Sequence, residues 1–244
     1  MKDNFSTQAQ AYSKFRPHYP PEMIEHIISF VKFKDCALDA ATGNGQVASA
    51  LSPYFKQVYG IDISSRQLEN AVKKDNILYM SQPAENTTFE DGQFDLVTVA
   101  QAIHWFDFDA FYKEVKRVLK PDGILAVMGY GLFYADEDTD AIIDHLYDNI
   151  TGEYWDPERR YIDEEYTTIP FPFQEIKAAK FTNELTWDFE QLMGYLETWS
   201  AVQHYIKKNG SSPLELVRED LRACWEKSDK KVYFPLLLRI GKIV

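Results

Sequence analysis

The chain has 244 residues, of which 45% are hydrophobic and 26% are charged, and its formal net charge at pH 7 is −12. This composition is typical of a globular protein large enough for one α/β domain with an insertion. The acidic balance argues against nucleic-acid partners and anionic membrane surfaces, because both require basic patches. We find no signal peptide, no membrane-spanning run and no metal-ligand spacing at the two cysteines, so we expect a cytoplasmic protein with no metal site.

The predicted elements start with a helix at residues 22–31, introduced by Pro20 and Pro21. Residues 39–130 then alternate strand and helix, which predicts a parallel sheet with helices on both faces. Beyond the fifth strand we expect helices at 136–148, 189–208 and 213–227, an aromatic and charged loop at 154–163, and strands at 176–187 and 232–243. No repeat or low-complexity tract divides the chain, so we predict a single domain over residues 1–244.

The most informative segment is residues 38–48, where a short apolar strand passes through a glycine-containing turn into a helix. A second predicted strand ends on Asp62, about twenty residues after Asp39 ends the first. Gly43 and Gly45 let the backbone pass close to a ligand, and the helix start presents unpaired N–H groups. Asp62 can accept both hydrogens of a ribose diol, so the pattern predicts a site for a nucleoside-type cofactor.

Two cofactors fit this pattern, because residues 43–48 also match the G-x-G-x-x-G/A motif of nicotinamide dinucleotide sites. The carboxylate of Asp39 lies just before the turn and would repel a pyrophosphate, whereas it would favour a cofactor carrying an ammonium and a sulfonium. We therefore predict S-adenosylmethionine (SAM) and keep an NAD-dependent oxidoreductase as the alternative.

Around these residues the chain resembles the class I SAM-dependent methyltransferases, whose motif is an acidic residue followed by x-Gly-x-Gly-x-Gly. Ala41 stands at the first glycine position, and we expect it to have a negative φ. The resemblance implies that Asp39 and residues 42–46 hold the methionine end and that Asp62 binds the ribose. The full set of cofactor contacts that it implies is Asp39, Ala40, Thr42, Gly43, Asn44, Gly45, Asp62, Ile63, Ala84, Glu85, Ala100 and Trp105.

Three later segments resemble the same family in the expected order. Residues 81–85 look like its adenine-contacting turn, residues 92–106 like its fourth-strand motif, and residues 118–127 like its helix end and fifth strand. The resemblance implies a Rossmann-like sheet of seven mostly parallel strands with an antiparallel last strand. It also implies a cofactor-binding core at 36–130 and a helical, aromatic substrate cap inserted at 131–172.

The tract at residues 15–20 resembles the N-terminal signature of small-molecule methyltransferases close to trans-aconitate methyltransferase. In those enzymes the N-terminal segment is a lid, so the resemblance implies a lid at residues 1–21; the alternative is that this segment packs beneath the sheet. Tyr12, Arg16 and Tyr19 are then candidates for substrate binding.

His104 lies at the carboxyl end of the fourth predicted strand, where it is a candidate catalytic and substrate-binding residue. It can act as a general base, hydrogen-bond the cofactor or substrate, or be structural. The sequence His-Trp-Phe resembles enzymes that methylate small acids, and a carboxylate, already ionised at pH 7, needs no base.

Arg159 and Arg160 are the best candidates for binding an acidic acceptor, because the planar guanidinium matches a carboxylate. Alternatively, the flanking acidic residues neutralise this pair at the surface. We expect a SAM-dependent methyltransferase that acts on a carboxylate oxygen of a small organic acid, as a monomer or weak homodimer. A protein that binds SAM without catalysis remains a further alternative.

Overall fold

The computed structural model describes residues 15–243, so Tyr12 and the rest of the first fourteen residues of the predicted lid lie outside the described part of the chain. Within residues 15–243 the strands form one eight-stranded sheet in the order β3-β2-β1-β4-β5-β8-β6, with β7 also paired to β8. The strands are β1 Cys36–Ala40, β2 Gln57–Asp62, β3 Ile77–Ser81, β4 Phe94–Ala100, β5 Leu119–Tyr130, β6 Gln174–Ile176, β7 Phe181–Thr186 and β8 Lys231–Lys242.

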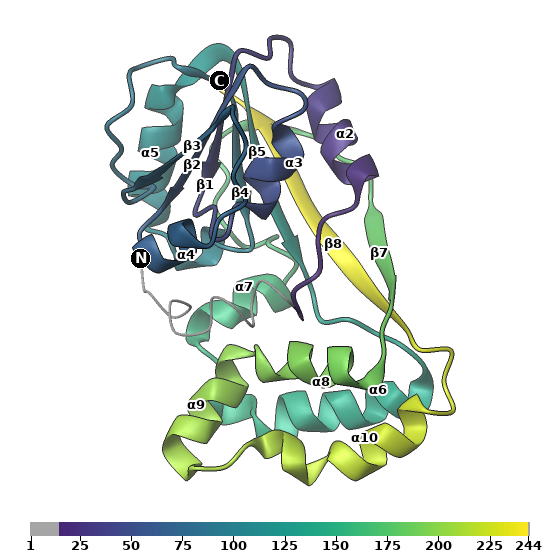
Figure 1. The fold of residues 1–244 in the computed structure, drawn as a ribbon. Helices are drawn as coiled ribbons and strands as arrows, with labels where there is room; N and C mark the ends of the chain where they lie inside the picture. Colours follow the sequence, from purple (N-terminus) through teal and green to yellow (C-terminus); the bar gives the residue numbers. More distant parts are fainter. Residues whose placement is uncertain (1–14, 244) are drawn as a thin grey trace.

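The first five strands are parallel and β8 is antiparallel to β5, as predicted for the Rossmann-like fold. Successive side chains along each strand point to opposite faces of the sheet, and each face has its own hydrophobic core. Ala37 and Leu96 pack with helices α2 Pro21–Ser29 and α3 Gln46–Leu51, whereas Leu38 and Val97 pack with α5 Phe108–Val118. Figure 1 shows α2 and α3 on one side of the sheet and α5 on the other. This arrangement brings the carboxyl ends of β1, β2 and β4 to one edge.

The sheet has eight strands rather than the predicted seven, because the strand predicted at 176–187 is β7, and a further short strand, β6, precedes it. Both strands pair with β8, but the register changes between them. Four residues lie between Ile176 and Phe181, whereas three lie between their partners Ile240 and Leu236. The extra residue cannot be paired, so the pairing is interrupted at a bulge-like irregularity.

Helices from two separate segments form a layer beyond the carboxyl edge of the sheet (Figure 1). They are α6 Glu137–Asp144, α8 Phe189–Glu197, α9 Ser200–Asn209 and α10 Arg218–Trp225, and their apolar side chains share one core. The layer therefore draws on residues beyond 172, outside the insertion expected at 131–172. The predicted helix at 189–208 is divided at Thr198 and Trp199, where Trp199 is extended with ψ 133°.

Short helical turns follow several of these elements. The turn η2 Ile103–Trp105 lies between β4 and α5. Between α6 and β6 the chain forms η3 His145–Ile150, η4 Gly152–Tyr154, η5 Pro157–Arg159 and α7 Arg160–Asp163, and η6 Pro213–Leu216 joins α9 to α10 within the layer. Helix α4 Ser65–Glu69 follows β2, and its N-cap Ser64 accepts a hydrogen bond from the backbone N–H of Gln67. Within residues 15–243 no helix combines the length and apolar character needed to cross a membrane.

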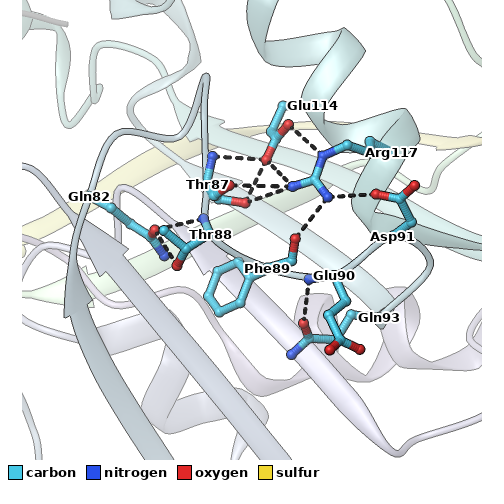
Figure 2. Close-up of polar contacts among 9 residues, drawn as sticks. All are labelled: Gln82, Thr87, Thr88, Phe89, Glu90, Asp91, Gln93, Glu114 and Arg117. Carbon is cyan, nitrogen blue, oxygen red and sulfur yellow. Dashed lines mark hydrogen bonds and ion pairs between the residues drawn. The ribbon is translucent and has the colours of Figure 1, made fainter.

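The long loop between β3 and β4 is fixed to α5 by a network of polar contacts (Figure 2). Arg117 donates to the backbone oxygen of Phe89 and pairs with Asp91, both at 2.7 Å. Glu114 accepts the backbone N–H of Thr87 at 2.8 Å. Burial by itself raises the pKa of Glu114, but the hydrogen bonds from Arg117 and Thr87 outweigh it and lower that pKa overall. The network therefore anchors the loop that follows the predicted adenine-contacting turn.

Candidate active site

A pocket lies at the edge where β1, β2 and β4 end. Its empty space is about 860 Å³, including the part open to solvent. Most of its wall comes from the β1–α3 turn, the end of β2 and the start of α4. Arg16, Tyr19 and Tyr130 also line the pocket.

The β1–α3 turn is tighter than the sequence indicated. Ala41, Gly43 and Gly45 all have positive φ, at 55°, 55° and 78°. The expectation of a negative φ at Ala41 is therefore wrong. The backbone N–H of Thr42 must reach the carbonyl oxygen of Ile61 at 2.8 Å, and the chain bends through the left-handed region to do so. Alanine has the smallest side chain after glycine, yet this conformation still costs it roughly 1–2 kcal/mol.

Asp39 is buried directly beneath this turn. Its Oδ2 accepts the backbone N–H of Ala48 at 3.0 Å and the hydroxyl of Thr42 at 2.5 Å, and its Oδ1 accepts the hydroxyl of Thr98 at 2.8 Å. Burial raises the pKa of Asp39 to about 6 despite these hydrogen bonds. Asp39 therefore holds the turn in shape and places a negative charge under the pocket at neutral pH.

Asp62, at the end of β2, connects the two loops that form the pocket floor. Its Oδ2 accepts the backbone N–H of Gly43 at 2.9 Å, and its Oδ1 accepts the N–H of Ser64 at 2.8 Å. Each carboxylate oxygen has a further lone pair, so Asp62 can accept hydrogen bonds from a ligand while it keeps both loops in place.

Eight of the twelve predicted cofactor residues line this pocket: Asp39, Thr42, Gly43, Asn44, Asp62, Ile63, Ala100 and Trp105. The other four do not. Ala40 and Ala84 are buried in the core beside α5, and Glu85 is outside the wall. Gly45 faces Tyr79, whose hydroxyl would lie 2.1 Å from a Cβ at that position. Gly45 thus allows Tyr79 to pack under the turn.

A second pocket lies between the strand ends and the helical layer. It shares Arg16, Gln101 and Trp105 with the first pocket, so the two adjoin along these three residues. The far wall is formed by His104, Trp155, Asp156, Arg159, Ile162, Trp199 and Ser200. A ligand here would lie next to a cofactor in the first pocket, against tryptophan rings and charged side chains.

His104 lies in the wall of the second pocket and is 5% exposed. Its Nδ1 is 3.3 Å from the hydroxyl of Tyr166. Burial, together with the positive charge of Arg159, lowers the pKa of His104 to about 3. A neutral imidazole with so low a pKa is a weak base, so this position suits hydrogen bonding to a ligand better than proton abstraction.

The two neighbouring arginines have different environments. Arg159 lies in the wall of the second pocket, and its Nε donates to the hydroxyl of Tyr147 at 2.8 Å and to Asp163 at 3.1 Å. Its guanidinium lies over the ring of Trp155 at 4.8 Å. Its two terminal nitrogens contact no acceptor within the described residues, so both can bind a ligand. Arg160 is exposed, lies over Tyr161 and is outside the pocket.

Arg16 ties the N-terminal segment to the rest of the molecule. Its Nη1 donates to the hydroxyl of Tyr130 at 3.1 Å, and its Nη2 donates to the carbonyl oxygen of Thr198 at 3.0 Å. It therefore bridges β5 and the helical layer exactly where the pockets adjoin. Tyr19 lines only the first pocket. Among residues 15–243 no group of three or more His, Cys, Asp or Glu side chains is arranged to hold a metal ion.

Comparisons with known proteins identify the family. A family model described as a methyltransferase domain matches residues 38–127. A Dictyostelium discoideum protein named as a methyltransferase is 35% identical over 249 residues, covering 98% of this chain and 95% of that protein. A solved structure from Anaeromyxobacter dehalogenans, described as a type II methyltransferase, is 34% identical with a TM-score of 0.86 and covers 94% of this chain and 99% of that chain. The chain belongs to the class I SAM-dependent methyltransferases.

A further relative carries the cofactor in its name. A Saccharomyces cerevisiae protein named as an S-adenosylmethionine-dependent methyltransferase is 31% identical over 136 residues, which are 52% of this chain and 47% of that protein. The methyltransferase family predicted from the first strand–turn–helix segment is therefore confirmed, and the NAD-dependent oxidoreductase is set aside.

The first pocket of this methyltransferase also contains polar groups from Gln46, which lies in the turn expected to hold the methionine end, and from Gln67, which sequence reasoning missed. Gln46 Nε2 and Gln67 Oε1 are buried in its wall and have no hydrogen-bond partner in the described part of the chain. A buried donor and a buried acceptor left unpaired are costly, and the amino-acid and nucleoside ends of SAM carry partners for both. Gln67 lies in the first turn of the helix that follows Asp62 and Ser64. Its spacing from Asp62 is a signal that the sequence did contain.

Gln101 is the other missed residue. It directly follows β4 with φ 53°, and its side chain forms hydrogen bonds with both backbone groups of Tyr130, at 2.8 and 3.1 Å. A strained residue fixed in this way at the junction of two pockets is typical of a functional position. Nothing in the sequence distinguishes it from its neighbours.

Proposed function

We propose that this methyltransferase transfers the methyl group of SAM to a carboxylate oxygen of a small organic acid. The observation that carries the proposal is Arg159, a largely buried guanidinium whose terminal nitrogens have no acceptor among the described residues, in a pocket that adjoins the SAM pocket. An arginine held by its Nε and by stacked rings is preorganised to bind a carboxylate.

SAM would occupy the first pocket, where it supplies an electrophilic methyl group on a sulfonium. In this proposal Asp62 accepts the ribose hydroxyls, and the negative charge of Asp39 lies under the methionine end. Gln46 and Gln67 offer the remaining donor and acceptor. Trp105, shared by both pockets, places an aromatic ring where a positively charged group is favoured.

The acceptor would occupy the second pocket. A carboxylate is ionised at neutral pH, so its methylation requires alignment with the methyl group and exclusion of water rather than a base. The low pKa of His104 agrees with a reaction that uses no histidine base. Arg16, Arg159 and the tryptophan rings would orient the acid and cover it. The resemblance of residues 15–20 to methyltransferases of small acids also supports this acceptor class.

The proposal is tested in two stages. Calorimetry with S-adenosylhomocysteine (SAH) should give micromolar binding to the wild type and at least a hundredfold weaker binding to Asp62→Ala, since charged hydrogen bonds are each worth about 1.5–3 kcal/mol. Release of SAH is then measured with mono- and dicarboxylic acids, phenols and amines. SAH binding combined with turnover of phenols or amines alone would disprove the carboxylate acceptor.

A further inference from the structure

The far wall of the second pocket contains an acidic group beside the arginine. Asp156 precedes η5, and the backbone N–H of Arg159 donates to its carbonyl oxygen at 2.9 Å, closing a tight helical turn. Residues three apart in such a turn lie on the same side. Both side chains line the pocket, yet the ion pair of Arg159 is made with Asp163 and not with Asp156. The wall thus presents a cation and an anion next to each other.

The carboxylate of Asp156 has no structural task among residues 15–243. It does not cap η5, and no described residue donates a hydrogen bond to it. The nearest cationic candidate is Nδ1 of His204, 3.9 Å from Oδ2, but that nitrogen lies 2.9 Å from the carbonyl oxygen of Tyr154 and must donate to it. The Asp156 side chain is 14% exposed, and leaving so buried a carboxylate unpaired costs stability.

We infer that the pocket selects acids that carry a hydrogen-bond donor, a hydroxyl or an ammonium group, on the carbon next to a carboxylate. Arg159 would bind that carboxylate through its terminal nitrogens, and Asp156 would accept the donor. Both side chains line the same ten-residue pocket, so we expect the two ligand groups on the same or adjacent atoms. This inference rests on the proposed function and specifies its acceptor.

The position of the pair also determines which end of the acceptor reacts. The pockets adjoin at Arg16, Gln101 and Trp105, whereas Asp156 and Arg159 line only the second pocket. A carboxylate bound by Arg159 therefore anchors the acceptor, and a second carboxylate at the other end would reach the junction and receive the methyl group. The best acceptors are then short dicarboxylic acids with an α-hydroxyl or α-amino group.

The experiment compares glutarate, α-hydroxyglutarate and glutamate as acceptors. For the wild type, kcat/KM should be at least about tenfold higher for one of the substituted acids than for glutarate, as expected for one hydrogen bond to a charged group. Comparison of α-hydroxyglutarate with glutamate identifies whether a hydroxyl or an ammonium group is the donor. Asp156→Ala should reduce the preference to within about twofold, and its melting temperature should be equal or higher because an unpaired buried charge is removed.

Asp148→Ala is the matched control, since Asp148 is an exposed acid of the same segment and outside the pocket; it should keep the preference. Equal use of all three acids by the wild type, or an unchanged preference in Asp156→Ala, would overturn the inference. If none is turned over, their affinities in the presence of SAH must show the same ratios. Binding without those ratios refutes the inference alone, whereas absence of binding by any acid refutes the proposed function as well.

Discussion

The two adjoining pockets are built in different ways. In the first, the polar groups come mainly from one continuous stretch, from Asp39 through the β1–α3 turn to Asp62 and Gln67, and backbone hydrogen bonds fix them. In the second, the wall is assembled from four separate segments, represented by Arg16, His104, Arg159 and Trp199. The comparison teaches that a common cofactor can be held by local structure, whereas the acceptor site depends on how distant segments pack.

The sharpest test of this division is Arg159. Arg159→Met should lower kcat/KM for acid acceptors by about a hundredfold, because a bidentate charged hydrogen bond is lost, while the Kd for SAH stays within about twofold. Steady-state kinetics and calorimetry measure the two effects. Arg160→Met is the control and should change neither, since Arg160 lies outside the pocket. Equal effects of the two substitutions would show that the acceptor is bound elsewhere.

The next test concerns the charge beneath the first pocket. The folded pKa of Asp39 is about 6, so the carboxylate is ionised above that pH and protonated below it. Affinity for SAH should therefore fall as pH decreases through about 6, by up to about tenfold per pH unit, because the protonated form no longer attracts the ligand's ammonium. Calorimetry between about pH 5 and 7 measures this, and Asp39→Asn should be weaker but independent of pH. A flat wild-type profile would remove Asp39 from the ligand's electrostatics.

A smaller effect is expected at His104. Since its pKa is lowered to about 3, it stays neutral across the working range. His104→Gln should reduce kcat/KM by less than about tenfold and leave the pH profile between about 6 and 8 unchanged, whereas loss of a true general base costs about 10²–10⁴-fold. Rate measurements over that range decide the question. A loss of that larger size, together with the disappearance of an ionisation, would identify His104 as a base.

The smallest effect concerns strain in the β1–α3 turn. Ala41→Gly relieves the left-handed conformation but adds freedom to the unfolded chain, so the free energy of unfolding should rise by no more than about 1 kcal/mol. Urea unfolding measures the difference. Ala41→Val is the opposing control and should be destabilising, because a β-branched side chain tolerates positive φ poorly. A destabilised Ala41→Gly would mean that the alanine methyl group contributes more by packing than it costs in strain.

The cofactor half of the site was predictable because its signals are local. Asp39, Gly43 and Asp62 follow strands whose apolar runs are visible in the sequence, and parallel strands must bring those ends to one edge of the sheet. The alternation of strand and helix predicted a parallel sheet, and the family resemblance implied the antiparallel last strand. It missed the φ of Ala41, because the bend depends on a hydrogen bond from Thr42 to a neighbouring strand.

Tertiary structure alone decided the acceptor half. Arg159 and Arg160 are adjacent and share the same acidic neighbours, so composition cannot rank them; the turn of η5 puts one into the pocket and leaves the other exposed. Of the several acidic residues that flank these arginines, it is Asp163 that pairs with Arg159. The separation of β6 from β7 likewise depends on register against β8. Periodicity determines elements and strand ends, but which side chains meet across the helical layer is fixed only when all of its segments pack together.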